Sequence, residues 1–149
     1  MICTVTVGEL DLDSGRTEFV DHTIACFDDL VRFFDEVYDD GASQLKEMTG
    51  DALVDKSSGE PIGGFSARVS NNFGGRIEVG IGRDWWLLID LVPKGARFIT
   101  GSTPAQTDFI FFLDGWHYTG IGSDDVIPRD ECLAAIEKWL DGHDLNGDT

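Results

Sequence analysis

The chain has 149 residues, of which 42% are hydrophobic and 11% aromatic, enough for one folded domain and too apolar for a disordered chain. Its 28 acidic residues outnumber 11 basic ones and leave a net charge of −17. A surface of that charge repels nucleic acid and anionic membranes and attracts a basic partner, although acidity also serves solubility or salt tolerance.

Residues 1–149 are predicted to form a single cytoplasmic domain. No run approaches about 18 apolar residues, the length of a transmembrane helix, and the residues after Met1 lack the basic and apolar regions of a signal peptide. Three cysteines without C-x-x-C spacing favour neither a zinc site nor a disulfide framework. Cys26 and Cys132 stand beside apolar residues, which predicts buried, unreactive thiols.

A β-hairpin is the first element predicted along the chain. Residues 2–10 and 17–24 are rich in β-branched side chains, as strands are. Asp13-Ser14-Gly15 between them is a turn signal. The two runs are therefore expected to pair.

An amphipathic helix follows the hairpin. Apolar residues recur at helical spacing from Leu30 to Tyr38, with Asp28 and Asp29 ahead of them at the end where the helix dipole favours acids. Gly41 is the predicted stop. Residues 42–64 are polar and broken by glycine, which predicts mostly loop, with a short helical turn possible around Gln44 to Met48.

The middle of the chain is predicted to be sheet. Short apolar runs alternate with turn signals, and Asp114-Gly115 is the strongest hairpin signal among them. Because the turns are short, consecutive strands are expected to pair antiparallel as a meander. The predicted strands cover residues 65–69, 76–82, 85–92, 96–100, 109–113 and 116–121, and the run 85–92 is apolar on both faces, as in a central strand.

A second helix is predicted to end the fold. Pro128 suits its first position, Leu133, Ile136, Trp139 and Leu140 form its apolar face, and Gly142 suits its stop. Residues 144–149 are expected to fray. The predicted class is α+β, an antiparallel meander with two amphipathic helices packed on one face.

Catalytic and cofactor motifs are weak in this sequence. Gly80-Ile81-Gly82 lacks the third glycine of a dinucleotide fingerprint, and His22, His117 and His143 have no partner at metal-ligand spacing. We therefore predict no cofactor, no metal and no enzymatic activity. Two other classes stay open: a small enzyme that uses Cys26 or a carboxylate pair with a histidine, and an acidic adaptor domain.

The charge pattern favours a protein-binding surface made of acids and aromatics. Trp86, Leu88 and Phe111 are predicted core residues, whereas Trp85 and Trp116 stand beside acids and would act as anchors if exposed. For each tryptophan taken singly, however, the sequence favours a buried position in the core. The predicted contact residues lie near the turns of the sheet and the end of the first helix: Asp39, Asp40, Asp84, Trp85, Asp114, Trp116, Asp124 and Asp125.

Several segments carry a family resemblance. They are the strand Gly75–Ile81 running into Arg83–Ile89, the hairpin Phe109–Tyr118, the Asp-rich helix start within Phe27–Tyr38, and a terminal helix marked by Ile127-Pro128, Ala135, Trp139, Leu140 and Gly142. With these motifs the chain resembles immunity protein family 1 of bacterial polymorphic toxin systems. After Gly142 it departs from the family pattern.

The resemblance implies a function that agrees with the charge. A member of this family would bind and neutralise a cognate toxin, and such toxins include nucleases and nucleic-acid deaminases with positively charged substrate sites. An acidic domain can occupy a basic cleft in place of nucleic acid. The expected partner is thus a toxin domain with a basic surface, bound by a protein that is monomeric beforehand.

Overall fold

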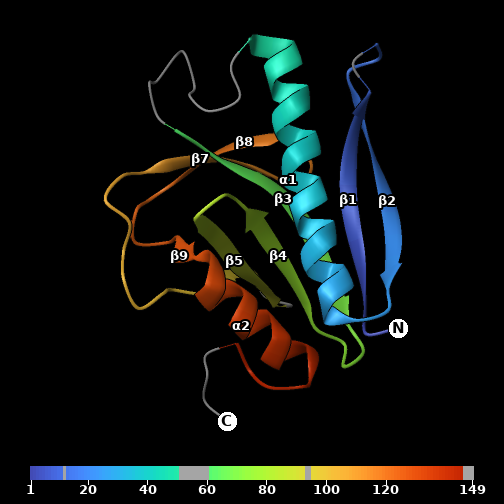
Figure 1. The fold of residues 1–149 in the computed structure, drawn as a ribbon, viewed down its shortest axis with the longest axis vertical. Coiled ribbons are helices and arrows are strands. Elements are labelled where there is room, and N and C mark those ends of the chain that lie inside the picture. The colour runs from blue at the N-terminus through green and yellow to red at the C-terminus, as the bar shows by residue number, and fades with distance from the viewer. Residues whose placement is uncertain (12, 51–60, 93–94, 146–149) are drawn as a thin grey trace.

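The computed structural model describes residues 1–11, 13–50, 61–92 and 95–145 (Figure 1). The α+β class predicted from sequence is confirmed, with nine strands and two helices in this part of the chain. In chain order the elements are β1 (Cys3–Asp11), β2 (Arg16–Ile24), α1 (Phe27–Thr49), β3 (Ile62–Asn71), β4 (Arg76–Ile81), β5 (Trp85–Val92), β6 (Gly95–Phe98), β7 (Phe109–Leu113), β8 (His117–Ile121), β9 (Ile127–Pro128) and α2 (Arg129–Leu140).

The sheet is a meander for most of its width. Its strand order is β2-β1-β3-β4-β5-β6, and each neighbouring pair in this series is antiparallel. The predicted antiparallel meander is thus confirmed for these strands, and β7 is an exception: it returns to β3 and pairs with it in parallel, while β8 pairs with β7. Ile110 and Phe111 point to opposite faces of β7, and both are buried. Other elements must therefore pack on both faces of this strand, which a position beside the exposed strand β6 would not provide.

The sheet splits along one edge of β3, and this split positions the site described below. Phe65 pairs with β4 on one side and with Phe112 of β7 on the other. Further along the same edge β1 takes the place of β7, with the last pair at Thr6 and Arg68. Beyond Thr6 the strand β1 continues with β2 alone. A gap therefore opens beside Ser66, between β1 and β7.

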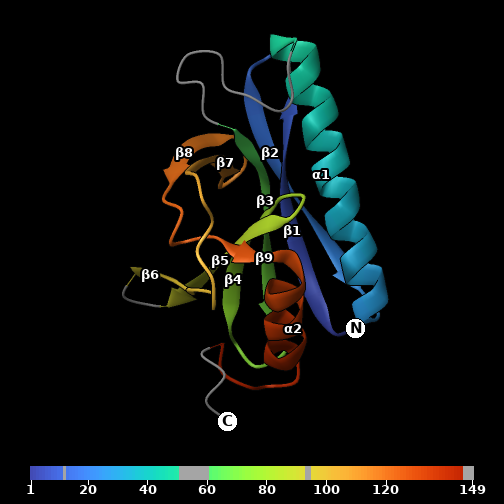
Figure 2. The ribbon, with the colours of Figure 1, turned by 60° about the vertical axis from the view of Figure 1, so that its left-hand side comes forward.

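Both helices cover the same face of the sheet, as predicted (Figure 2). Buried side chains of α1 and α2 join one cluster with β3, β4 and β5, and that cluster includes Leu30, Phe34, Val69, Ile77, Trp86, Leu88, Cys132, Ile136 and Trp139. A second cluster lies around Leu87 and Phe111, and a third around Phe65 and Ile110. Trp86, Leu88 and Phe111 are buried, which confirms their predicted core role.

The first helix is longer than predicted because Gly41 does not stop it. α1 runs through to Thr49 and ends at Gly50, which takes a left-handed conformation with φ 81°. Gly41 lies inside the helix against the ring of Phe65, where a Cβ would come within 2.5 Å of Cγ. Glycine at this position allows the helix and the strand to approach closely. This requirement comes from tertiary packing and cannot be seen in a local helix-stop pattern.

The loop predicted at 42–64 is shorter than expected at both ends, although the helical turn considered around Gln44 to Met48 is indeed helical. Residues 42–49 belong to α1, and β3 begins at Ile62, three residues before the predicted strand. Residues 51–60 lie outside the described part of the chain. Gly63 and Gly64 belong to the strand, where Phe111 and Ile81 pack too close for a larger residue.

The cysteines correct a further prediction, that Cys26 is buried. Cys26 is exposed at the start of α1, since the chain there turns from β2 into the helix at the surface. Cys3 and Cys132 are buried, and burial raises the pKa of the Cys3 thiol to about 11 and that of Cys132 further. In the tail that was expected to fray, Leu145 packs into the core, and residues 146–149 lie outside the described part.

Candidate protein-binding site

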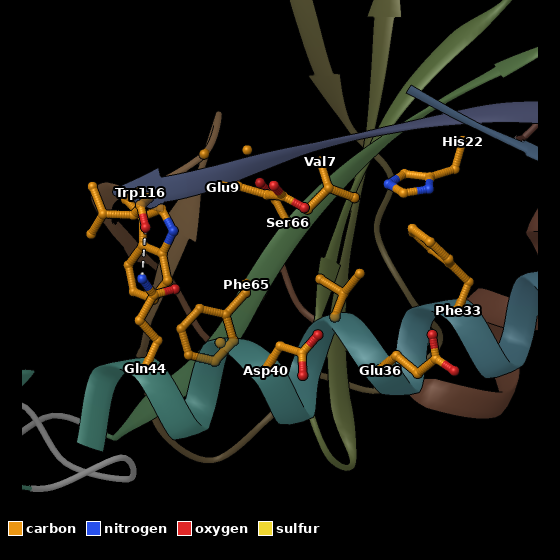
Figure 3. A pocket seen from close by; sticks show the side chains of 15 residues that line it. Val7, Glu9, His22, Phe33, Glu36, Asp40, Gln44, Phe65, Ser66 and Trp116 are labelled. Carbon is orange, nitrogen blue, oxygen red and sulfur yellow. Dashed lines mark hydrogen bonds between the residues drawn. The ribbon is translucent and has the colours of Figure 1, made fainter. Parts of the chain in front are cut away.

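A pocket of about 410 Å³ opens where the sheet splits, between β1 and α1 (Figure 3). Three of its lining side chains are carboxylates and none is a lysine or arginine, so we call it the acidic pocket. It is lined by Val7, Gly8, Glu9, Leu10, His22, Phe33, Glu36, Val37, Asp40, Gly41, Gln44, Phe65, Ser66, Gly115 and Trp116.

Two of the three acids of this pocket, Glu9 and Asp40, continue rows of residues that point inward elsewhere in the same elements. On β1 the inward row of alternate residues is Cys3, Val5 and Val7, and Glu9 is its next member. On α1 the apolar stripe that includes Phe33 and Val37 continues through Asp40 and Gln44. Both rows become polar where β1 leaves β3. The split thus turns core positions into the walls of a pocket.

Aromatic rings bound the acidic pocket at both ends (Figure 3). At one end His22 packs on Phe33, with ring centroids 4.8 Å apart. At the other end Trp116 lies 5.3 Å from Phe65, centroid to centroid. Gln44 closes that end by donating a hydrogen bond of 2.9 Å from Nε2 to the carbonyl oxygen of Leu10.

The β7–β8 turn, which carries Trp116, is held in place by a small charged network. Arg68 contacts Glu78 at 3.2 Å and Asp114 at 2.8 Å, and the backbone N–H of Asp114 donates to Glu78 Oε2 at 2.7 Å. Asp114 and Gly115 both have positive φ, as the predicted hairpin signal requires. This network contains one cation and two carboxylates, so it does not offset the acids of the pocket.

A second hollow, of about 460 Å³, adjoins the first and shares Leu10 and Trp116 with it. Large apolar side chains reach solvent here, with Phe19 54% and Met48 48% exposed. We call this hollow the apolar groove. Its lining comprises Leu10, Gly15, Thr17, Phe19, Leu45, Met48, Phe112, Asp114, Trp116 and His117.

A family profile, that of the immunity protein Imm1, matches residues 20–145. The chain belongs to the Imm1 family. No curated protein and no solved structure matches it. The match confirms the resemblance seen in the sequence, and membership implies a cognate toxin as partner and a non-enzymatic, inhibitory role.

The structure of this Imm1 protein brings only some of the predicted contact residues together. Asp40 and Trp116 line the acidic pocket, and Asp114 and Trp116 line the apolar groove. Both Trp116 and Trp85 are half-buried, with one edge against the core clusters.

The remaining predicted residues lie elsewhere on this Imm1 protein. Asp84 and Trp85 line a different pocket, of about 250 Å³, beside Arg83. Asp124 and Asp125 lie in the loop before β9, and Asp39 is exposed on α1. Among the residues of the two hollows that sequence reasoning missed are Glu9, Glu36, Phe19 and Met48. Glu9 was detectable as a charge at an inward strand position.

The structural features that an enzyme would need are poorly met in this Imm1 protein. The pocket beside Cys26 has Glu137 and Lys138 but no histidine. His22 shares the acidic pocket with carboxylates, yet within the described residues no hydrogen bond joins it to one, and its ring packs on Phe33. In the same part of the chain no three metal-binding side chains cluster, and no helix could span a membrane.

Proposed function

We propose that this Imm1 protein neutralises its cognate toxin by covering a basic, nucleic-acid-binding site with the end of the molecule that holds the acidic pocket and the apolar groove. The observation that carries the proposal is the joining of these two hollows at Trp116. A toxin that acts on nucleic acid must present cations to phosphates. An acidic surface that binds those cations excludes the substrate.

Charge is concentrated at this end of the chain. The first 50 residues, which form β1, β2 and α1, contain 12 acidic and 3 basic side chains, a net charge of −9. The other 99 residues share the remaining −8. One of the three bases, Arg32, already pairs with Asp29. The electrostatic field that steers a basic partner is therefore strongest around β1, β2 and α1.

Exposed apolar side chains at this end of the molecule would lengthen the lifetime of the complex, which charge alone does not. Charge complementarity mainly speeds association, whereas buried apolar anchors set how long a complex lasts. Phe19 and Met48 come from two different elements, β2 and α1, and line one groove, which also includes Asp114 and adjoins the acidic pocket. An apolar centre with a charged rim is typical of protein interfaces.

The proposal is tested with the toxin that this protein captures, assayed on nucleic acid. Toxin activity should fall to zero at one equivalent of the immunity protein. The pair of changes Phe19→Ala and Met48→Ala should weaken inhibition, whereas Phe73→Ala should not, because Phe73 is 67% exposed on the β3–β4 turn, away from both hollows. A saturated toxin that still degrades or deaminates nucleic acid refutes the mechanism, and so does a toxin with another kind of substrate.

The contact residues outside the two hollows can be separated by the same assay. Charge reversal at Asp114 should slow association at low salt, because this carboxylate lies on the groove. Reversal at Asp84 tests whether the interface reaches the pocket beside Trp85. Asp39, Asp124 and Asp125 remain predicted contacts, to be ranked by the loss each reversal causes.

A further inference from the structure

We infer that the acidic pocket receives a single arginine side chain, which the toxin projects into it. This inference rests on the proposed function, because the toxin supplies the arginine. It goes further by naming the group that is recognised and the residues that recognise it. Three features of the pocket select a guanidinium: opposed carboxylates, the hydroxyl of Ser66, which has no hydrogen-bond partner among the described residues, and aromatic walls.

Carboxylates face the pocket from two walls. Glu9 stands on the strand side, and Glu36 and Asp40 stand four residues apart on the helix side (Figure 3). None of the three has a lysine or arginine within ion-pair distance in the described part of the chain. Like charges around a concave space repel one another and favour an incoming cation. They do not favour a metal ion, since no three ligands cluster among the described residues.

Ser66 adds a polar group that is otherwise unexplained. Ser66 lines the pocket at the gap between β1 and β7, although the residue is only 5% exposed. Among the described residues its Oγ has no hydrogen-bond partner. The hydroxyl is therefore free to accept a hydrogen bond from a donor that enters the pocket. A guanidinium N–H can donate to this oxygen and to the carboxylates together, because it carries five donors in one plane.

The aromatic walls favour arginine over a compact ammonium. The planar guanidinium stacks on aromatic faces and is more weakly hydrated than the ammonium of lysine. Trp116 and Phe65 at one end, and Phe33 at the other, offer such faces. A volume of about 410 Å³ is at the lower end for small-ligand pockets, which span about 300–1,000 Å³. The space is large enough to admit an arginine side chain.

The test needs no toxin, so it can fail separately from the proposed function. The whole protein is titrated with N-acetyl-arginine amide while the indole N–H signals of its four tryptophans are followed by NMR. N-acetyl-citrulline amide, which has nearly the same shape without the charge, is the control ligand. Saturable movement of the Trp116 signal with the arginine compound alone is the expected result. Equal movement with citrulline, or none with either, overturns the inference.

Matched variants locate the effect. Glu9→Gln with Asp40→Asn keeps shape and removes two pocket charges, and this should weaken binding of the arginine compound about tenfold or more. Glu137→Gln with Asp141→Asn removes the same charge from exposed positions at the end of α2 and should leave binding nearly unchanged. Equal weakening by both pairs would mean that net charge, not the pocket, attracts the ligand.

Discussion

Arg68→Met is the change that most directly tests how the β7–β8 turn is held beside the acidic pocket. Arg68 lies opposite Glu78 in the sheet, and Glu78 is only 4% exposed. In the native protein the Glu78 carboxylate accepts hydrogen bonds from Arg68 Nε and from the backbone N–H of Asp114. Methionine fills much of the volume of the arginine stem but leaves the buried carboxylate with one donor.

The size of the loss follows from these contacts. A hydrogen bond to a charged group contributes about 1.5–3 kcal/mol, and breaking a fully buried ion pair costs about 3–5 kcal/mol. Arg68 is 36% exposed, so solvent screens part of its charge. The pair with Asp114, which is more than half exposed, adds little. We expect the free energy of unfolding to fall by about 2–3 kcal/mol.

Urea denaturation of wild type and variant gives this difference directly, because a chain of this size is expected to unfold in one transition. The double variant Arg68→Met with Glu78→Met is the decisive control. It removes the stranded carboxylate together with its partner, so it should be more stable than the single variant by about 1 kcal/mol or more. A single variant that loses less than about 0.5 kcal/mol, or a double variant no better than the single one, refutes the assigned role of this pair.

Three other outcomes are expected. Gly41→Ala gains helix propensity of about 1 kcal/mol but places a Cβ against the Phe65 ring. The free energy of unfolding, measured by urea denaturation, should therefore fall by about 1–2 kcal/mol, and a rise would contradict the packing. Iodoacetamide should alkylate Cys26 alone in the native protein, because Cys3 and Cys132 are buried and the pKa values of their thiols are raised. Mass spectrometry detects the labelled residues, and early labelling of Cys3 or Cys132 would be inconsistent with the fold. At low ionic strength circular dichroism should still show a cooperatively folded protein, whereas an acidic adaptor adapted to salt would unfold there.

Local patterns predicted the elements whose structure depends on near neighbours. The run 85–92 was read as a central strand and forms β5 over those residues. The Asp114-Gly115 signal forms the expected hairpin turn, because positive φ at both residues is a local requirement. The helix starting near Asp28 was predicted from apolar spacing and acids in the first turn, and α1 begins at Phe27.

Long-range packing decided the features that the sequence did not predict. The sequence at Gly41 has the pattern of a helix stop. A glycine is required there for another reason, because the ring of Phe65, 24 positions along the chain, lies where a Cβ would be. The parallel return of β7 to β3 joins residues about 50 positions apart, and no turn signal encodes such a pairing. The acidic pocket depends on that return, since its gap lies between β1 and β7. Asp40 and Trp116 were predicted as contacts, but not as neighbours in one pocket.

The position of the acids bears on how an inhibitor this acidic can still be selective. Carboxylates spread over a convex surface attract any basic protein and discriminate poorly among toxins. Glu9, Glu36 and Asp40 are exposed but line one concave space with aromatic ends, so a cation that projects from the partner surface can contact all three together. A basic toxin without a projecting arginine at the matching place would meet unpaired carboxylates and an unfilled pocket, and would dissociate faster. Selectivity should therefore follow the pocket, while association rate follows total charge.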